Sequence, residues 1–395
     1  MTVFGLQWTQ GADSYARPAE SHLTDLAITS PTNAATLAAV AHASQHAPWS
    51  GMRRCNLCDD GTPTAYYGDR CYTDTDVANM GQAMVQIPKF WYTTNHGGGV
   101  YIWYISDTGA DALPAGADHA WAVHPAFLRD GATKSYIYLG AYEGYLNGTK
   151  LESRAGYQPK DSLTRAQFRT SARLRKDSSG TTANYWEIPD YNTISAIDLL
   201  YLVEYGRFNS SLVLSAGVSN LTQGVVNKSC TTGHTTSLGN TSGDVPFTAE
   251  TQAVTTHAMS YRGIENFYGN IGCVIDGIKI QANYKLWVAD HDFNDDVASF
   301  THPYVDSTCV LFATDGYAAD ISTSASQDYG FLASSVTSGS ASAKLCDYYF
   351  MATGNLSMRH GGGWWYGDFN GMFTNQGCTI ANYDVSIGSR LMYIG

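Results

Sequence analysis

The sequence is poor in charge and has no basic run. Only 15% of its 395 residues are charged, and 35 acidic residues outnumber 23 Lys and Arg, which gives a formal net charge of -12. Proteins that bind a nucleic-acid backbone concentrate basic residues, so no nucleic-acid partner is expected. The 39 Gly and 27 Tyr residues must supply much of the polar surface, together with Ser, Thr and Asn. Such a composition is more typical of an extracellular or virion surface than of a cytosolic enzyme.

Long hydrophobic runs are also missing. No stretch approaches about eighteen consecutive apolar residues, so no membrane insertion is expected. Residues Met1 to Tyr15 lack the basic start and the apolar run of a secretory signal. We therefore expect a soluble chain without a signal peptide.

Catalytic and nucleotide-binding motifs are absent. The chain has no G-x-S-x-G, H-E-x-x-H, P-loop or dinucleotide fingerprint, so we expect neither enzyme activity nor a cofactor. Asp198 and Glu204 lie on or near a helix with a wide apolar face, where a salt bridge or a solvent-facing position is favoured over catalysis. The eight Cys residues are too widely spread to define a disulfide framework, and free thiols are expected.

Two segments have part of a metal-binding pattern. Cys55-Asn-Leu-Cys58 and Cys71 would need a fourth ligand such as His46 to hold zinc, and a second C-x-x-C is missing. The segment Asp290–Asp296 alternates carboxylates as a calcium loop does, but it lacks the central Gly and the final Glu. An ordinary loop is favoured at both places, and no metal site is predicted.

Secondary-structure patterns change along the chain. Residues 1 to about 80 have no clear period, apart from an alanine-rich stretch that predicts a short helix over Asn33–Ala47. Runs of β-branched and aromatic residues predict strands, the first two joined as a hairpin across Asn95–Gly99. Stretches rich in Ser and Thr, 206–258 and 322–343, predict long loops. The predicted strands are Met84–Tyr92, Val100–Ile105 and Tyr136–Tyr142, and the predicted helices are Thr164–Arg175, with a capping box, and Asn192–Tyr205, capped by Gly206.

The C-terminal segment, residues 355–393, interleaves Trp, Tyr, Phe, Asn, Asp and Gly without a strand or helix period. Such a mixture is poor material for a core. Antibody-type paratopes favour the same residues, because rigid rings give contact area at a low entropy cost and small polar residues adapt. The segment therefore predicts a binding surface.

Several blocks of the chain point to one family. The block Tyr261–Ile278, followed by Gly361–Phe373 and Ile387–Tyr393, resembles the variable proteins of diversity-generating retroelements. The further blocks that are similar to viral tail proteins of this group are Ile87–Phe90, His124–Phe127, Gly140–Tyr145 and Asp198–Tyr205. The family includes the phage major tropism determinant and tail-tip proteins of bacterial and archaeal viruses. Its C-type lectin fold is shared with formylglycine-generating enzymes.

The resemblance covers the chain from about Gln82 to its end and implies an α+β class. The expected architecture is a C-type lectin fold with long loop insertions, a mixed antiparallel sheet and two helices, after a less regular N-terminal region. Residues 1–80 would be an N-terminal region of unassigned role, with assembly or packing as the role considered for it. Residues 81–395 would form the ligand-binding domain, with its variable region at about 355–393.

In this family the retroelement rewrites adenine positions near the 3′ end of the gene, so that one face varies while the fold holds. The resemblance therefore implies two sets of residues. The framework set is Arg359, Gly361, Gly362, Trp364, Gly367, Gly371, Phe373, Ile387, Gly388 and Arg390. The variable, ligand-binding set is His360, Gly363, Trp365, Tyr366, Asp368, Phe369, Asn370, Thr374, Asn375, Asn382, Tyr383 and Asp384. Mutated Asn-type codons do not yield Trp, so Trp365 is kept in this set only as a contact.

The function that the resemblance implies is receptor binding without catalysis, by a virus-encoded protein at the tip of a tail or fibre of the virion. The partners would be a host-cell surface protein or glycan and other virion proteins, and a homo-oligomer stays open. A structural virion protein, whose aromatic segment packs against a neighbouring subunit, is one alternative. A metallo-oxidase of the formylglycine-generating type is another, but Cys346 and Cys378 do not match the Cys pair that it needs.

Overall fold

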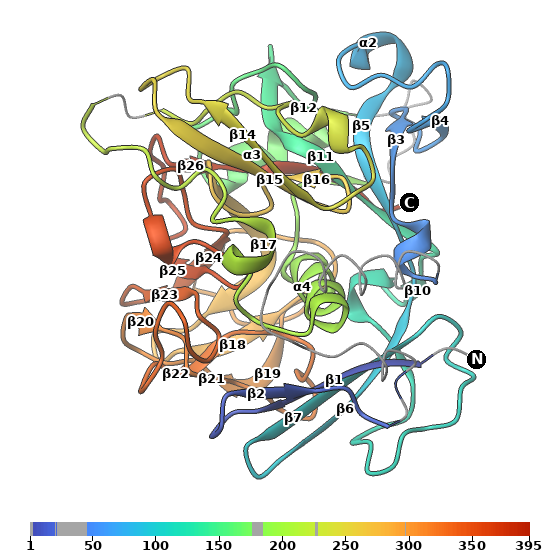
Figure 1. The fold of residues 1–395 in the computed structure, drawn as a ribbon, viewed down its shortest axis with the longest axis vertical. Helices are drawn as coiled ribbons and strands as arrows, with labels where there is room; N and C mark the ends of the chain where they lie inside the picture. Colours follow the sequence, from blue (N-terminus) through green and yellow to red (C-terminus); the bar gives the residue numbers. More distant parts are fainter. Residues whose placement is uncertain (1–2, 20, 22–45, 176–184, 226–227, 297) are drawn as a thin grey trace.

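The computed structural model describes residues 3–19, 21, 46–175, 185–225, 228–296 and 298–395. Strands predominate over helices in these residues, and the predicted α+β class is confirmed. The sheets lie around one long helix, α4 (Tyr191–Tyr205), which Figure 1 shows near the centre of the molecule. No helix among these residues is long and apolar enough to cross a membrane.

Helix α4 is buried along its whole length. A helix that is mostly apolar all round is stable only inside a core, and α4 contacts strands β1 (Val3–Thr9), β7 (Val100–Ser106) and β17 (Gly272–Ile280). Its first turn is capped by Asp190, whose carboxylate accepts a hydrogen bond from the Thr193 N–H at 2.7 Å. Gly206 ends it in the left-handed region at φ 73°. The predicted helix and its cap are thus confirmed.

The other predicted helix is α3 (Arg165–Arg173). Thr164 accepts a hydrogen bond from the Gln167 N–H, and the Gln167 side chain accepts one from the Thr164 N–H, so the predicted capping box is confirmed. Helix α3 buries Phe168 and Ala172. Two single-turn helices, α2 (Val77–Met80) and α5 (Ser211–Leu214), were not predicted.

The sheet that carries the C-terminal segment is mixed. Its strand order is β19-β18-β17-β24-β25-β23-β20, and β26 pairs with β17. The β23–β25 and β17–β26 pairs are parallel, and the other pairs are antiparallel. The strands besides β17 are β18 (Lys285–Val288), β19 (Val305–Val310), β20 (Gly316–Tyr317), β23 (Tyr348–Met351), β24 (Leu356–His360), β25 (Asn375–Cys378) and β26 (Ile387–Gly388).

Two further sheets complete the core. One has the order β13-β27-β11-β5-β3-β4, with β12 beside β11, and the other has the order β2-β1-β7-β6-β8. Their strands are β2 (Ser14–Ala16), β3 (Arg53–Leu57), β4 (Pro63–Tyr66), β5 (Gln82–Pro88), β6 (Trp91–Gly97), β8 (Ala122–Val123), β11 (Tyr136–Asn147), β12 (Lys150–Ser153), β13 (Trp186–Glu187) and β27 (Arg390–Tyr393). Smaller sheets contain β9 (Leu128–Arg129), β10 (Ala132–Thr133), β14 (Gly243–Thr248), β15 (Thr255–Tyr261), β16 (Ile264–Glu265), β21 (Asp320–Ile321) and β22 (Ala333–Ser335).

The first eighty residues are more regular than predicted. Strand β1 pairs with β7 along its whole length, and β3 pairs with β5. The boundary predicted at residue 80 therefore runs through two sheets. Local patterns did not predict these strands, because their partners lie far along the chain. Except for its last two residues, the helix predicted over Asn33–Ala47 lies outside the described residues.

The predicted strands need one correction. The run Met84–Tyr92 is not one strand, since the chain leaves β5 at Pro88 and enters β6 at Trp91 in a different sheet. The hairpin of β6 and β7 is confirmed, as is a strand at Tyr136, which β11 extends to Asn147. The loop predicted over 206–258 contains β14 and the start of β15, so it is not irregular throughout.

Candidate functional site

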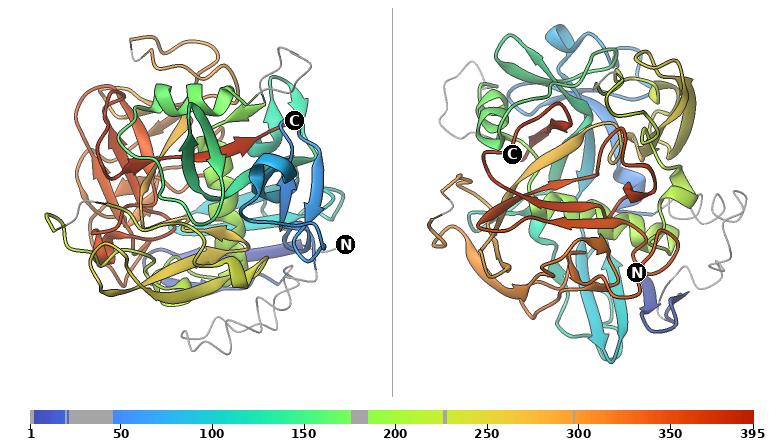
Figure 2. Two further views of the ribbon diagram at one scale, coloured as in Figure 1. Left: turned by 90° about the horizontal axis from the view of Figure 1, so that it is seen from above. Right: turned by 90° about the vertical axis from the view of Figure 1, so that its left-hand side faces the viewer.

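The C-terminal segment lies across one face of the molecule. Figure 2 (right) shows its red ribbon on the side that is turned toward the viewer. Strands β24 and β25 lie inside the mixed sheet, between β17 and β23. The loop between them contains a single 3-10 turn, η4 (Gly367–Phe369). Regular strands thus hold both ends of the loop in place.

The residues predicted to vary fall into three groups by burial. The exposed members are Asp368, Phe369, Tyr383 and Asp384, and the half-buried members are Trp365, Tyr366 and Asn382. The buried members are His360, Gly363, Asn370, Thr374 and Asn375. A partner that docks on the folded protein does not reach this last group of five, so seven of the twelve predicted residues are accessible.

The buried members have partners inside the loop. The Asn370 side chain accepts a hydrogen bond from the Gly363 N–H at 3.0 Å and donates one to the Gly363 carbonyl at 2.7 Å. The Asn375 side chain donates to the Phe373 carbonyl at 3.1 Å. His360 is buried in β24, and burial lowers the pKa of its imidazole to about 4. These polar side chains order the loop from within.

The residues predicted as framework are buried, with the exception of the half-buried Gly367. Arg390 in β27 donates hydrogen bonds to the backbone carbonyls of Gly140, Glu265 and Asn266. It therefore joins three segments that are remote in sequence. Arg359 donates to Gln376 Oε1 at 2.6 Å, to Ser386 Oγ at 3.2 Å and to the Tyr366 hydroxyl.

A continuous row of rings lies beside this loop, and we call it the aromatic face. Each ring in it is partly accessible to solvent, and Phe369 is 36% exposed. The Tyr348 ring lies 4.2 Å from Phe369, 4.5 Å from Phe350 and 5.1 Å from Tyr317, between centroids. Tyr366 continues the row at 5.4 Å from Phe350 and 5.0 Å from Trp365. The aromatic face consists of Tyr317, Tyr348, Phe350, Trp365, Tyr366 and Phe369.

Half of the aromatic face was missed from the sequence. Trp365, Tyr366 and Phe369 belong to the predicted variable set, whereas Tyr317, Tyr348 and Phe350 come from the neighbouring strands β20 and β23. Tyr348 and Phe350 are two residues apart on one strand, so they point to the same side of the sheet. That spacing was visible in the sequence, but the pairing of β23 with β25 was not.

A shallow groove of about 300 Å³ adjoins the aromatic face at Phe350. Asp315, Gln376 and Asn382 contribute to its lining. Asn382 is the predicted variable residue that lies in the groove, and the exposed Tyr383 follows it in the chain. Rings and hydrogen-bonding groups are therefore side by side on this surface, and protein interfaces combine the same two kinds of group.

Two framework glycines provide a matched test of the loop's packing. A Cβ at Gly362 would overlap Oδ1 of Asn370, whereas a Cβ at Gly367 would meet open space. Both residues have positive φ, 69° and 56°, so both alanine variants bear the same backbone strain. We expect Gly367→Ala to cost about 1 kcal/mol and Gly362→Ala to cost at least about 1 kcal/mol more, measured by urea unfolding. Equal losses would contradict the tight contact between Gly362 and Asn370.

Neither partial metal pattern is assembled into a site in the described residues. Cys55 is buried in β3 while Cys71 is exposed, and all eight Cys residues are free thiols. Asp295 pairs with Arg165 at 2.7 Å and with Arg169 at 2.8 Å, so this carboxylate of the predicted calcium segment is bound to arginines. No group of three or more His, Cys, Asp or Glu suited to a metal occurs within these ranges of the chain.

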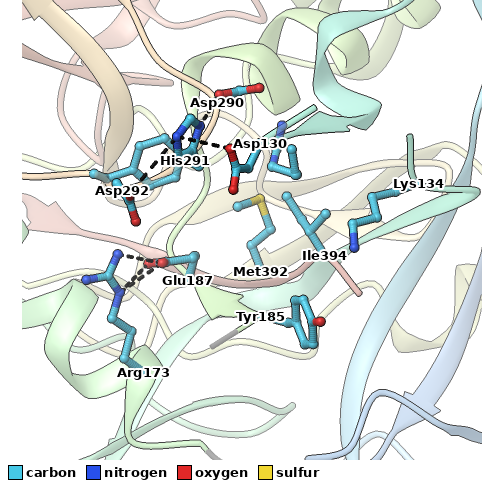
Figure 3. Close-up of a pocket in the computed structure, with 12 residues that line it drawn as sticks. Asp130, Lys134, Arg173, Tyr185, Glu187, Asp290, His291, Asp292, Met392 and Ile394 are labelled. Atoms are coloured by element: carbon cyan, nitrogen blue, oxygen red, sulfur yellow. Dashed lines mark hydrogen bonds and ion pairs between the residues drawn. The ribbon is translucent and has the colours of Figure 1, made fainter. Parts of the chain in front are cut away.

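A cavity of about 570 Å³ lies elsewhere, and no residue of the predicted variable or framework sets lines it (Figure 3). Figure 3 shows Met392 and Ile394 between groups of charged side chains. His291 Nδ1 is 2.5 Å from Asp290 Oδ1, and Arg173 pairs with Glu187 at 2.6 Å. Burial raises the pKa of Glu187 to about 7 despite that arginine. The cavity's charges thus largely satisfy one another.

Comparison with known proteins adds no relative. The sequence matches no protein-family model, and a search of curated proteins finds no significant match.

Proposed function

We propose that this chain is a virus-encoded receptor-binding protein with a C-type lectin fold, diversified by a retroelement, that recognises a host-surface molecule through the aromatic face. The observation that carries the proposal is the row of partly exposed rings. Trp365, Tyr366 and Phe369 in that row belong to the segment that resembles the family's variable region. The fold is part of the proposal, since the mixed sheet under the C-terminal segment is compatible with it.

The aromatic face has the physical properties of a binding surface. Its rings are held against one another, for example Tyr348 against Phe369, so little side-chain entropy is lost when a partner covers them. Aromatic residues supply many of the strongest contacts in protein interfaces. The loop that carries Phe369 is fixed from behind by Asn370 and Thr374, whose hydroxyl donates to the Phe369 carbonyl at 2.6 Å. Exposed side chains can therefore change while the buried ones keep the loop in shape.

Sequencing of this gene in many clonal isolates tests the proposal. Codon differences should concentrate in residues 355–393 and should favour the accessible positions, such as Asp368, Phe369, Tyr383 and Asp384. The buried positions Asn370 and Thr374 should change far less, because their hydrogen bonds order the loop. A reverse-transcriptase gene and an imperfect template copy should lie near the gene.

Two results would contradict the proposal. An invariant C-terminal segment across isolates would favour a structural virion protein, whose aromatic face packs against a fixed neighbour. Codon differences spread evenly along the gene would show ordinary drift. Strand β11, which is largely buried and lies outside the segment, provides the internal reference for that drift.

A further inference from the structure

Exposed carboxylates flank the aromatic face. Asp368 follows Gly367 in η4, and its charge raises the pKa of the Tyr317 hydroxyl, after the larger effect of burial. Burial raises the pKa of the Tyr366 hydroxyl and Arg359 lowers it, while Asp384, near the other end of the face, adds a smaller rise. Asp315 lines the groove beside Phe350. All three aspartates are exposed to solvent.

No exposed cation balances these carboxylates from the same part of the chain. Residues 311–395, which are all described, contain Lys344, Arg359 and Arg390 as their Lys and Arg residues. Lys344 donates to the backbone carbonyls of Gln10 and Gly11, and the two arginines are buried and hydrogen bonded. Each of these three cations is thus engaged by hydrogen bonds, Lys344 while half-buried and the two arginines while buried, and the exposed charges that residues 311–395 place beside the aromatic face are carboxylates.

We infer that the aromatic face binds a segment of a host surface protein that presents Lys or Arg side chains. This inference rests on the proposed function and names its partner class. A cationic head group over a Tyr or Phe ring is attracted by the ring's quadrupole, and a carboxylate beside the ring adds a charge-assisted hydrogen bond. The row Tyr317, Tyr348 and Phe369, with Asp368 at its end, offers both contacts.

Charge also argues against a polyanionic partner. An acidic polysaccharide or a nucleic acid would meet the flanking carboxylates and a protein whose net charge is -12. Like charges placed against each other suppress association, whereas opposite charges accelerate the encounter of two proteins. A cationic protein segment satisfies both the rings and the carboxylates.

Peptide selection on the immobilised full-length protein tests the inference. A displayed library of random peptides serves as the probe, and each selected peptide is then measured against variants. The ring variant, Tyr348→Ala/Phe369→Ala, removes two rings from the face. The face-charge variant, Asp315→Asn/Asp368→Asn/Asp384→Asn, removes three carboxylate charges. Asn retains the oxygen with which Asp315 accepts from the Met351 N–H and Asp384 from the Ser386 N–H. The control variant, Asp60→Asn/Asp130→Asn/Asp292→Asn, removes three exposed carboxylate charges outside the face.

The expected peptides are enriched in Lys or Arg. They should not bind the ring variant, and their affinity for the face-charge variant should be at least about tenfold lower than for the wild type. The control variant should bind them as the wild type does, and added salt should weaken binding. Peptides that need the rings but show no Lys or Arg enrichment, and that bind the face-charge variant normally, would overturn the inference and leave the proposed function standing. Peptides that bind the ring variant undiminished would overturn both. No enrichment at all would overturn the inference alone, because a glycan receptor would still satisfy the proposed function. Circular dichroism of each variant establishes that it is folded.

Discussion

Replacing Glu204 by Gln should lower the free energy of unfolding by about 3 kcal/mol at neutral pH. Glu204 lies in the last turn of α4 and is fully buried. Its carboxylate accepts hydrogen bonds from Arg262 at 2.6 and 3.0 Å and from the Tyr261 hydroxyl at 3.0 Å. The Gln variant leaves the Arg262 guanidinium buried without a counter-charge, which is the costly way to break such a pair.

Urea unfolding of three variants separates this effect from a general loss of charge. Asp306→Asn is the matched control, because Asp306 pairs with Lys285 at 2.5 Å on a partly exposed strand pair, and its loss should cost less than about 1 kcal/mol. Replacing both buried partners, as in Glu204→Leu/Arg262→Met, should recover part of the stability. A Glu204→Gln variant no less stable than Asp306→Asn would contradict the importance of the buried pair.

The contact between Glu204 and Arg262 also shows what the sequence could indicate. A salt bridge or a solvent-facing position was favoured for both Asp198 and Glu204. The salt bridge is confirmed for Glu204, although its partner could not be named, whereas the prediction is wrong for Asp198, which is buried in α4 without an ion pair to any described residue. Arg262 lies in the turn after β15, 58 residues farther along the chain. The helix itself was predictable, because its apolar run and Gly206 are local signals. The choice of partner depends on how α4 packs against the sheets.

The same limit applies to the candidate site. The rings of the C-terminal segment were predicted to be at a surface from their composition, and Phe369 and Tyr383 are exposed. Asn370 and Asn375 have the same polar character in the sequence, yet both are buried. Burial of a short polar side chain depends on the partners that the fold provides, such as the Gly363 backbone for Asn370. The residue types of a segment therefore indicate that it contributes to a surface, but they do not determine which of its side chains are exposed.

Strand pairing set the other limit. Tyr348 and Phe350 complete the aromatic face only because β23 lies parallel to β25, next to the loop that carries Phe369. The intervening residues include β24, which pairs with β25 on its other side. No short-range pattern specifies such an insertion, so the aromatic face could be predicted in its C-terminal half alone.

Replacing Asp347 by Asn should make the free energy of unfolding fall less steeply as the pH rises. Asp347 directly precedes Tyr348 of the aromatic face and is buried, and burial raises the pKa of its carboxyl to about 8 although the Phe373 N–H donates to it at 2.8 Å. Burial, with Asp347 next in effect, also raises the pKa of Asp198 on α4. In the folded protein, Asp347 therefore stays protonated to a higher pH than in the unfolded chain.

The sign of the effect follows from that difference. Below the ordinary pKa of 3.8, both the folded and the unfolded state hold the proton, so the stability associated with Asp347 is fully present. Between pH 3.8 and about 8 the unfolded chain loses the proton first, and stability falls by up to about 1.4 kcal/mol per pH unit. Asn keeps an acceptor for the Phe373 N–H and has no charge to bury, so this contribution to the slope should disappear.

Urea unfolding at pH 5 and at pH 8 measures the slope. At each pH, the free energy of unfolding of the wild type is subtracted from that of Asp347→Asn. This difference should be larger at pH 8 than at pH 5 by at least about 2 kcal/mol. Asp315→Asn, which also removes one carboxylate near the aromatic face but an exposed one, should leave the difference between the two pH values unchanged. Equal slopes for Asp347→Asn and the wild type would mean that Asp347 is ionised in the folded protein. If Asp347 is neutral, its ionisation in alkaline solution weakens the support of the aromatic face, because it places a buried charge at the Phe373 N–H and next to Tyr348 in the chain.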